Sequence, residues 1–220
     1  MLDMHLLIHR KREELRQEVL TMGGLVAGAL RKSIDCLRHQ DPELARQIIA
    51  EDRPINQQRR MLEQECLVLL AAHQPAGSDL REIGASLEIV SELERIADHA
   101  ADTARIVLDA GGERFLAGPV AHITQIAEEA TAMVVAALAA YEAEDAEKAR
   151  AAAARDDQVD GQEKVVVKEI LAAMSESGAL AAIGTYMLWA VHNYERVGDR
   201  ATNIAERVVF AATGRTPDLD

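Results

Sequence analysis

Aromatic residues and proline are scarce in this chain of 220 residues, since aromatics make up 3% and there are 5 prolines. Ala, Leu, Glu and Arg, which favour helices, dominate instead, and the β-branched and aromatic enrichment of sheet proteins is missing. Hydrophobic residues make up 49% of the chain, which is enough for a packed core. The composition therefore argues against both a disordered chain and a sheet protein, and it predicts an all-α fold.

Basic residues and cysteines are also few. There are 24 basic against 37 acidic side chains, and the net charge of −13 repels nucleic acid and anionic membranes but favours metal cations or basic protein patches. Cys36 and Cys66 lack CxxC spacing, which predicts two core residues in a reducing compartment. The chain starts without a signal-peptide layout, and the longest apolar run, Ala132 to Tyr141, is too short to span a bilayer. A cytoplasmic protein without membrane insertion is expected.

Six long helical patterns fill the chain, separated by short segments that carry cap and turn residues. Asp41-Pro42 is a helix start, since Asp is a good N-cap and Pro suits the first turn, and Gly214 is a helix end. Helices of roughly 25 to 35 residues exceed the usual length of about 12 and predict elongated antiparallel bundles. The predicted helices cover approximately 5–38, 42–73, 78–112, 118–141, 145–174 and 177–214.

The sequence also repeats itself at long range. The segment 91–100 matches 192–201, so that residue 94 aligns with 195 and 98 with 199, an offset of 101 residues. Upstream, 51–56 resembles 155–160 at an offset of 104. The simplest architecture is two tandem antiparallel three-helix bundles, similar to spectrin repeats, with one repeat in residues 1–112 and the other in residues 113–220.

The sharpest motif is E-R-[IV]-x-D, which occurs once in each half. Glu94 and Asp98 form the first copy and Glu195 and Asp199 the second. A spacing of four places both carboxylates on one helix face, with Cβ atoms about 5 to 6 Å apart. A step of about 100° per residue puts each pair in or beside the apolar stripe of its helix, at the same phase in both copies.

Two like charges on an inward stripe need compensation, because desolvating an ionised carboxylate costs several kcal/mol. A bound cation supplies it, and an all-oxygen ligand set suits Mg, Ca, Mn or iron. Arg side chains on neighbouring helices, or solvent at the stripe edge, are the alternatives. His99 and His192 flank the motifs, but the aligned residues are Arg200 and Ser91, so neither histidine is counted among the expected ligands. Neither a nucleophile–base arrangement nor a phosphate-binding glycine loop is found in the sequence.

The residues around both motifs resemble the PhoU family, the regulators associated with bacterial high-affinity phosphate transport. The resemblance extends over essentially the whole chain and rests on the segment 194–208, the Glu94 to Asp98 copy, Gln74-Pro75 followed by Asp79-Leu80-Arg81, and the stretch 52–56. It implies two three-helix bundles, residence in the cytoplasm and frequent homodimers. It also implies repression of the phosphate-starvation response through a link between the phosphate ABC transporter and its sensor histidine kinase.

The resemblance implies metal ions as well, with Fe, Mn, Mg or Zn as the ions considered. The family's ligand positions fall on Glu94, Asp98, Glu195 and Asp199, and weaker candidates from the preceding helices are Asp52 and Asp156. At Asp102 and Arg200 the chain departs from the commoner Asn and His, so the resemblance does not imply equal metal content in the two halves.

Two other functions fit some of these features. Helical bundles rich in carboxylates also hold di-iron oxidase sites, but such sites pair Glu with a Glu-x-x-His spacing, and here the i+3 positions are Ala97 and Gly198. A metal-free helical adaptor is the other alternative. The expectation drawn from the sequence is a regulator without enzymatic activity.

Overall fold

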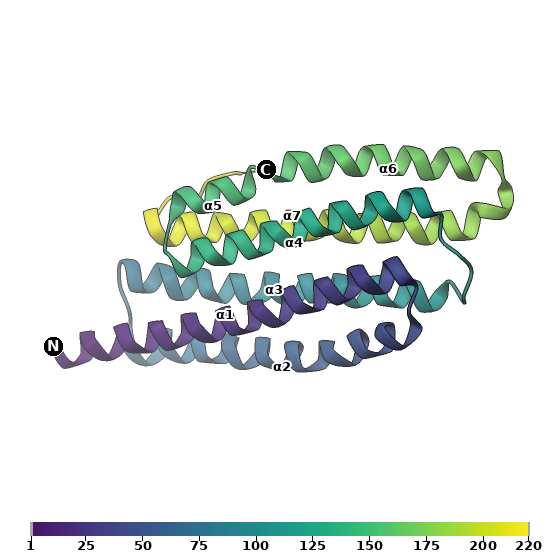
Figure 1. The fold of residues 1–220 in the computed structure, drawn as a ribbon. Helices are drawn as coiled ribbons and strands as arrows, with labels where there is room; N and C mark the ends of the chain where they lie inside the picture. Colours follow the sequence, from purple (N-terminus) through teal and green to yellow (C-terminus); the bar gives the residue numbers. More distant parts are fainter. Residues whose placement is uncertain (1, 220) are drawn as a thin grey trace.

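The computed structural model describes residues 2–219, with side chains from Leu7 onward, and every regular element in that range is helical. Three long helices form a first bundle, and the rest of the chain forms a second bundle beside it (Figure 1). The elements are α1 (Leu2–His39), α2 (Pro42–His73), α3 (Ser78–Asp109), α4 (Ala117–Glu142), α5 (Ala146–Ala153), α6 (Asp156–Glu176), the 3₁₀ turn η1 (Gly178–Leu180) and α7 (Ala181–Thr213). The predicted all-α architecture of two antiparallel bundles is confirmed.

Helix ends lie close to the predicted positions because the capping residues act as expected. The carboxylate of Asp41 accepts hydrogen bonds from the backbone N–H groups of Glu43 and Leu44 at 2.9 and 3.1 Å. Asp145 caps α5 in the same way. At the other end of the chain, α7 stops at Gly214, whose φ of 73° lies in the left-handed region that glycine adopts without strain.

The predicted helix over 145–174 is wrong in one respect, because the chain there forms two helices. It breaks at Ala154 and Arg155, where a tight turn separates α5 from α6. Arg155 pairs with Glu129 of α4 at 2.7 Å, and α6 begins with Asp156 and Asp157, whose charges favour a helix N-terminus. The Ala-rich stretch before the break contains neither Gly nor Pro, the residues that commonly end a helix, so the break could not be predicted from it.

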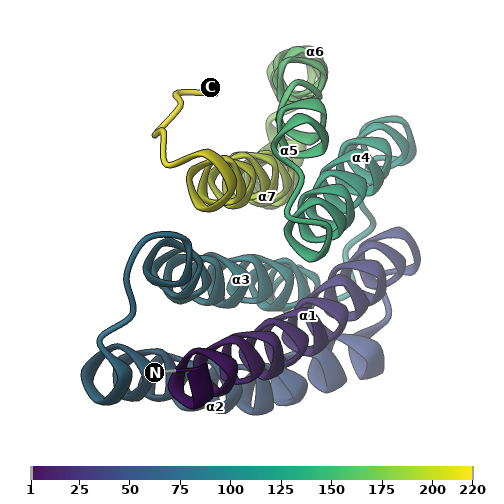
Figure 2. The same cartoon turned by 90° about the vertical axis from the view of Figure 1, so that its left-hand side faces the viewer.

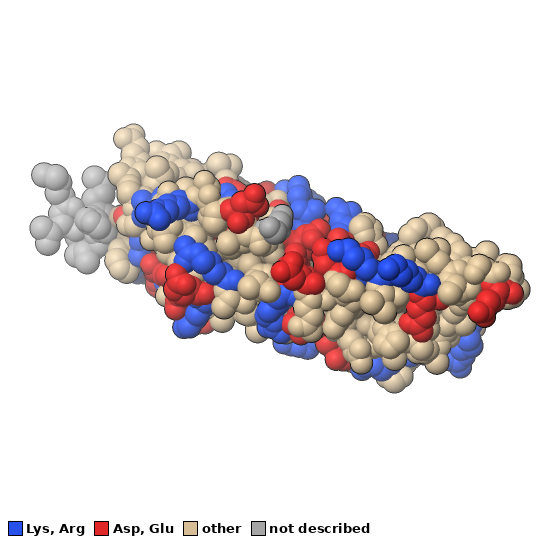
Figure 3. Space-filling model, turned by 90° about the horizontal axis from the view of Figure 1, so that it is seen from above, with Lys and Arg blue, Asp and Glu red and all other residues tan. Residues whose placement is uncertain are grey.

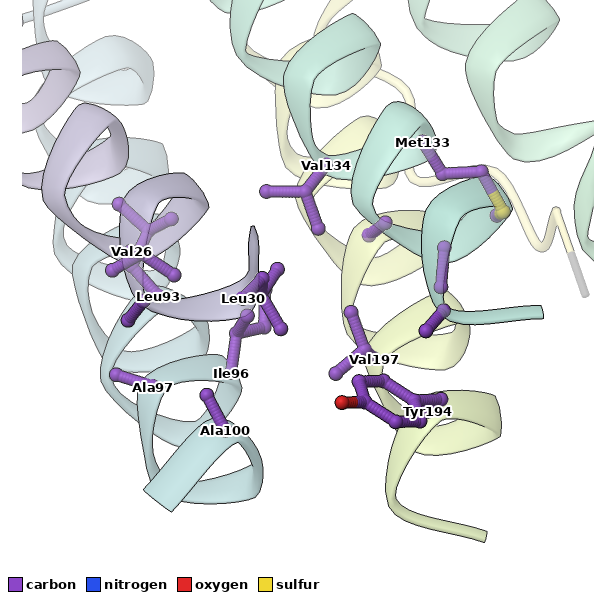
Figure 4. Packing of buried hydrophobic residues seen from close by; sticks show 14 of the residues in the cluster. Val26, Leu30, Leu93, Ile96, Ala97, Ala100, Met133, Val134, Tyr194 and Val197 are labelled. Carbon is purple, nitrogen blue, oxygen red and sulfur yellow. The ribbon is translucent and has the colours of Figure 1, made fainter. Parts of the chain in front are cut away.

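The two bundles pack against each other through α1, α3, α4 and α7, which leaves α2 and α6 on opposite outer sides (Figures 1 and 2). Leu30 and Ile96 of the first bundle face Val134 and Val197 of the second (Figure 4). The hydroxyl of Tyr194, itself fully buried, lies 3.0 Å from that of Ser33. One continuous core therefore holds both bundles, and each outer helix packs on two inner helices, α2 on α1 and α3, and α6 on α4 and α7.

Within residues 2–219, α4 alone is long and apolar enough to cross a membrane, which the ten-residue apolar run in the sequence did not suggest. Of its most apolar window, 61% is buried against the other helices, as in the core helix of a protein in water. The two cysteines are buried and form no disulfide, and burial raises the pKa of each thiol to about 12. Their predicted place in the core is confirmed.

Candidate metal centre

The first copy of the motif lies on α3, where this helix is covered by α2. The Glu94 side chain is 20% exposed and Asp98 is half-buried. Both therefore lie at the edge of the buried apolar stripe of α3, as their positions around the helix predicted. Arg59 of α2 approaches this pair, with its Nε atom 3.9 Å from Oε1 of Glu94. The same guanidinium pairs with Glu63 at 2.9 Å. An arginine from the neighbouring helix therefore supplies part of the compensation in this half.

Asp98 stands among further acidic groups. Burial, together with the negative charges of Glu94, Asp52 and Asp102, raises its pKa to about 6, while Arg105 acts in the opposite direction. Burial also raises the pKa of Asp52. The amide of Asn56 donates a hydrogen bond to one Asp52 oxygen at 2.7 Å, but the other oxygen, Oδ1, is buried and has no hydrogen-bond partner among the described residues.

The second copy lies on α7, where α6 covers it. Asp156, Asp160 and Glu163 follow each other at i, i+4 and i+7 on α6, which places them on one helix face. That face meets the motif on α7, and potential ligand atoms of Asp156, Asp160 and Asp199 lie within 4.8 Å of one another. Acidic side chains gather on this side of the molecule near its middle, where α5 gives way to α6 (Figure 3).

Glu195, the first acid of the second motif, belongs to a group of its own. Its ligand atoms and those of Glu163 and His192 all lie within 4.8 Å of one another. Burial, together with the charges of Asp199, Glu163, Asp160 and Asp156, raises the pKa of Glu195 to about 7. The Glu195 side chain is 19% exposed, so the repulsion acts in a partly dry environment.

Gly198 allows α6 and α7 to approach closely at this place. A Cβ atom at residue 198 would lie 2.8 Å from Oδ1 of Asp156 and 3.4 Å from Cγ1 of Val159. The first of these separations is shorter than real Cβ contacts, so a larger residue would displace the Asp156 carboxylate or the helix. The glycine in the second motif therefore sets how near Asp156 comes to α7.

The structure brings the six predicted site residues together in two places, Asp52 with Glu94 and Asp98, and Asp156 with Glu195 and Asp199. Sequence reasoning missed three residues of the second place, which are Asp160, Glu163 and His192. The i, i+4, i+7 spacing that begins at Asp156 was the available signal for the first two.

The second place suits a divalent cation, because carboxylate oxygens of α6 and α7 converge there and hard cations prefer such ligands. In the first place the charges of Asp52 and Glu94 act on Asp98, but among the described residues no three acidic or histidine side chains there bring ligand atoms within 4.8 Å of one another. The raised pKa values of Asp98 and Glu195 mean that ionising these groups is costly in the protein alone, and a cation at the same place would offset that cost. The buried Asp52 oxygen that has no hydrogen-bond partner among residues 2–219 also fits a coordinating role.

Both halves of the chain are similar to one known domain family. The PhoU domain model matches residues 19–107 and 123–208, so each match contains one carboxylate motif. The phosphate-specific transport system accessory protein PhoU homolog of Clostridium acetobutylicum is 33% identical over 94% of this chain and 95% of its own length. This chain belongs to the PhoU family.

Solved structures of the family share the fold. The crystal structure of PhoU from Pseudomonas aeruginosa superposes with a TM-score of 0.90 at 34% identity and covers 94% of this chain and 99% of that one. The phosphate transport system regulatory protein PhoU from Streptococcus pneumoniae gives a TM-score of 0.89 at 32% identity, over 96% of this chain and 99% of its own. The two PhoU matches on this chain coincide with the two bundles that hold the carboxylate clusters.

Proposed function

We propose that this protein is a metal-binding cytoplasmic regulator of phosphate uptake. It represses the phosphate-starvation regulon when phosphate is plentiful by linking the phosphate ABC transporter to its sensor histidine kinase. The observation that carries the proposal is the match of the PhoU domain to both halves of the chain, together with relatives that are named accessory or regulatory proteins of phosphate transport. The proposal assigns no catalytic step to this chain.

Metal binding is the chemical part of the proposal. In the first half the ion is held by Glu94, Asp98 and Asp52, and in the second half by Glu195, Asp199 and Asp156. In each half the ligands come from an outer and an inner helix, α2 with α3 and α6 with α7. An ion held in this way neutralises repelling carboxylates and ties the outer helix to the core. The ions proposed are Fe, Mn, Mg or Zn.

The regulatory part is tested by deleting the gene in its host and measuring a phosphate-regulon reporter in phosphate-rich medium. Expression is expected to rise in the deletion strain and to return to the repressed level with the wild-type gene. A plasmid that encodes Asp98→Asn and Asp199→Asn together tests whether the carboxylates are needed. Unchanged reporter activity in the deletion strain would contradict the regulatory role.

The chemical part is tested by metal analysis of protein purified without chelator, with and without the four motif carboxylates. A metal-free adaptor contains no stoichiometric metal in either form, whereas the proposed protein loses its metal when the carboxylates are replaced. Oxygen consumption and an oxo-bridged iron absorption band after addition of ferrous iron would instead favour a di-iron enzyme.

A further inference from the structure

The second bundle contains a nitrogen ligand that has no equivalent in the first. Nδ1 of His192 lies 3.2 Å from Oε2 of Glu195, and a ligand atom of each of these residues lies within 4.8 Å of a Glu163 oxygen. We propose that Glu163, His192 and Glu195 form a separate subsite for a borderline transition-metal ion such as Zn²⁺, Fe²⁺ or Mn²⁺. The inference rests on the proposed function, since it adds a subsite next to the carboxylate centre of the second half.

The separation of His192 and Glu195 is that of two ligands that share one ion. Zinc lies about 2.0 to 2.2 Å from imidazole nitrogen and carboxylate oxygen, so two ligands at right or tetrahedral angles are about 2.8 to 3.6 Å apart. The separation of 3.2 Å between His192 and Glu195 falls in this interval. The Oε2 atom of Glu195 is buried, yet within the described chain it receives no hydrogen bond of normal geometry, although the ring nitrogen is so near.

The helices present these side chains from two facing stripes. Glu163 lies one turn beyond Asp160 on α6, while His192 precedes Glu195 by three residues on α7 and so shares its face. The His192 side chain is 58% exposed and leaves the subsite open to solvent on one side. Three protein ligands and an accessible side are what a site with an exchangeable position requires.

The ligand types define the class of ion. Imidazole nitrogen binds borderline transition metals, whereas Mg²⁺ and Ca²⁺ prefer oxygen alone. The Asp156, Asp160 and Asp199 group next to the subsite contains only carboxylates and suits those harder ions. The second bundle therefore offers two neighbouring metal positions that prefer different classes of ion. Glu195 belongs to one and Asp199 to the other, and these two residues are one helical turn apart on α7.

The first bundle cannot form the same subsite, because two of its three ligands are replaced. Residue 91, which aligns with 192, is serine, and residue 59, which aligns with 163, is arginine. The Arg59 guanidinium lies 3.9 Å from Glu94, in the place where a third ligand would be needed. The positive charge of the Arg59 side chain already lies at that position, so the first half serves as a natural control for the second.

The test uses the full-length protein, freed of metal with chelator and titrated with Co²⁺, Zn²⁺ and Mg²⁺. His192→Ser introduces the residue of the first half at an exposed position, and Ser91→Ala is its control. We expect His192→Ser to lower Zn²⁺ affinity at one class of site by about tenfold or more, to weaken the Co²⁺ absorption bands of a nitrogen-ligated site, and to leave Mg²⁺ affinity unchanged. Ser91→Ala is expected to change none of these.

A transplant gives a second, independent outcome. The double variant Arg59→Glu with Ser91→His recreates the ligand set in the first half and should add one Zn²⁺ or Co²⁺ site per chain. Equal Zn²⁺ affinity and Co²⁺ spectra for wild type and His192→Ser would overturn the subsite, while loss of metal in Asp199→Asn would still support the carboxylate centre. Absence of metal binding in the wild-type protein would overturn both.

Discussion

The two halves of the molecule carry the same carboxylate motif in opposite electrostatic surroundings. In the first half Arg59 approaches Glu94, and Arg105 opposes the upward shift of the Asp98 pKa. In the second half the residue that aligns with Arg59 is Glu163, and the largest charge effects on the pKa of Glu195 come from four carboxylates. One half is partly neutralised by its own side chains, and the other concentrates negative charge.

This difference shows that a repeated motif does not imply a repeated site. The helix phase is the same in both copies, since Glu94 and Glu195 are 20% and 19% exposed. What differs is the outer helix, where Asn56 and Arg59 in α2 correspond to Asp160 and Glu163 in α6. The second half therefore has the stronger need for a cation, and the following predictions are designed to test that asymmetry.

The largest effect is expected from the motif aspartates in the presence of metal. Wild type should gain about 2.7 kcal/mol per occupied site at a hundredfold excess over the dissociation constant, and the variant Asp98→Asn with Asp199→Asn should not, because an amide is a neutral and weaker ligand. Thermal melts with Mn, Mg, Zn or ferrous iron measure this gain. In chelator the variant should be at least as stable as wild type, since repulsion is relieved.

The two single variants provide the comparison between halves. Asp199→Asn should remove more of the metal-dependent gain than Asp98→Asn, because four carboxylates act on Glu195 in the second half, whereas Arg59 and Arg105 act on the first motif. A variant that loses stability equally in chelator and in metal would show that the acids are paired with basic side chains, and the metal proposal would be withdrawn.

Exchanging the residues that distinguish the halves should reverse the asymmetry. Glu163→Arg places a cation beside Glu195 and should stabilise the chelated protein by about 1 kcal/mol while weakening metal binding in the second half. Arg59→Glu should have the opposite effect in the first half. Chemical denaturation in chelator, paired with metal titration, measures both quantities. Parallel changes of the two variants would contradict the electrostatic comparison.

The fold was predictable from the sequence because cap residues and hydrophobic phase act locally. Asp41, Asp145 and Gly214 mark helix ends through their own chemistry, and the phase of Glu94 and Glu195 follows from the apolar residues of the same helix. The turn at Ala154 was not predictable, because its Arg155–Glu129 pair joins different helices.

The composition of each site was only partly predictable for a similar reason. The register between α6 and α7 decides which α6 residues meet Glu195, and a sequence pattern on one helix carries no information about that register. Glu163 and His192 belong to the site only because the two helices are packed at this register. Arg59 likewise becomes a partner of Glu94 through packing of α2 on α3.

A pH-dependent difference between wild type and Glu195→Gln is expected in chelator. The pKa of Glu195 is about 7 in the folded protein against 4.5 for the ordinary group. Its contribution to folding stability is therefore favourable below about pH 4.5 and is lost as the pH rises through 7. The neutral variant should therefore be more stable than wild type by about 1 kcal/mol at pH 8, after allowance for partial solvent screening, and the gap should close on acidification. Denaturation curves from pH 8 to 4.5 test this.

Taking the difference between the stabilities of the two proteins removes the titrations of groups that do not interact with Glu195. His99, whose pKa burial lowers to about 4, destabilises the fold as the pH falls below 6.5, and it does so equally in both proteins. A gap that stays constant with pH would mean that Glu195 titrates normally in the folded protein.

The smallest effect on stability is expected where the two motifs differ by one methyl group. Gly198→Ala gives the second motif the alanine that Ala97 provides in the first, and alanine favours a helix interior over glycine by about 1 kcal/mol. The new Cβ would stand 2.8 Å from Oδ1 of Asp156, so displacing that carboxylate should offset most of the gain. The net change in unfolding free energy should be a few tenths of a kcal/mol, whereas metal affinity in the second half should fall severalfold because Asp156 moves away from Asp199.

The reverse change, Ala97→Gly, is the control: it should cost about 1 kcal/mol through helix propensity and leave metal affinity in the second half unchanged. Unaltered metal affinity in Gly198→Ala would show that the close approach at Gly198 serves packing rather than the metal centre.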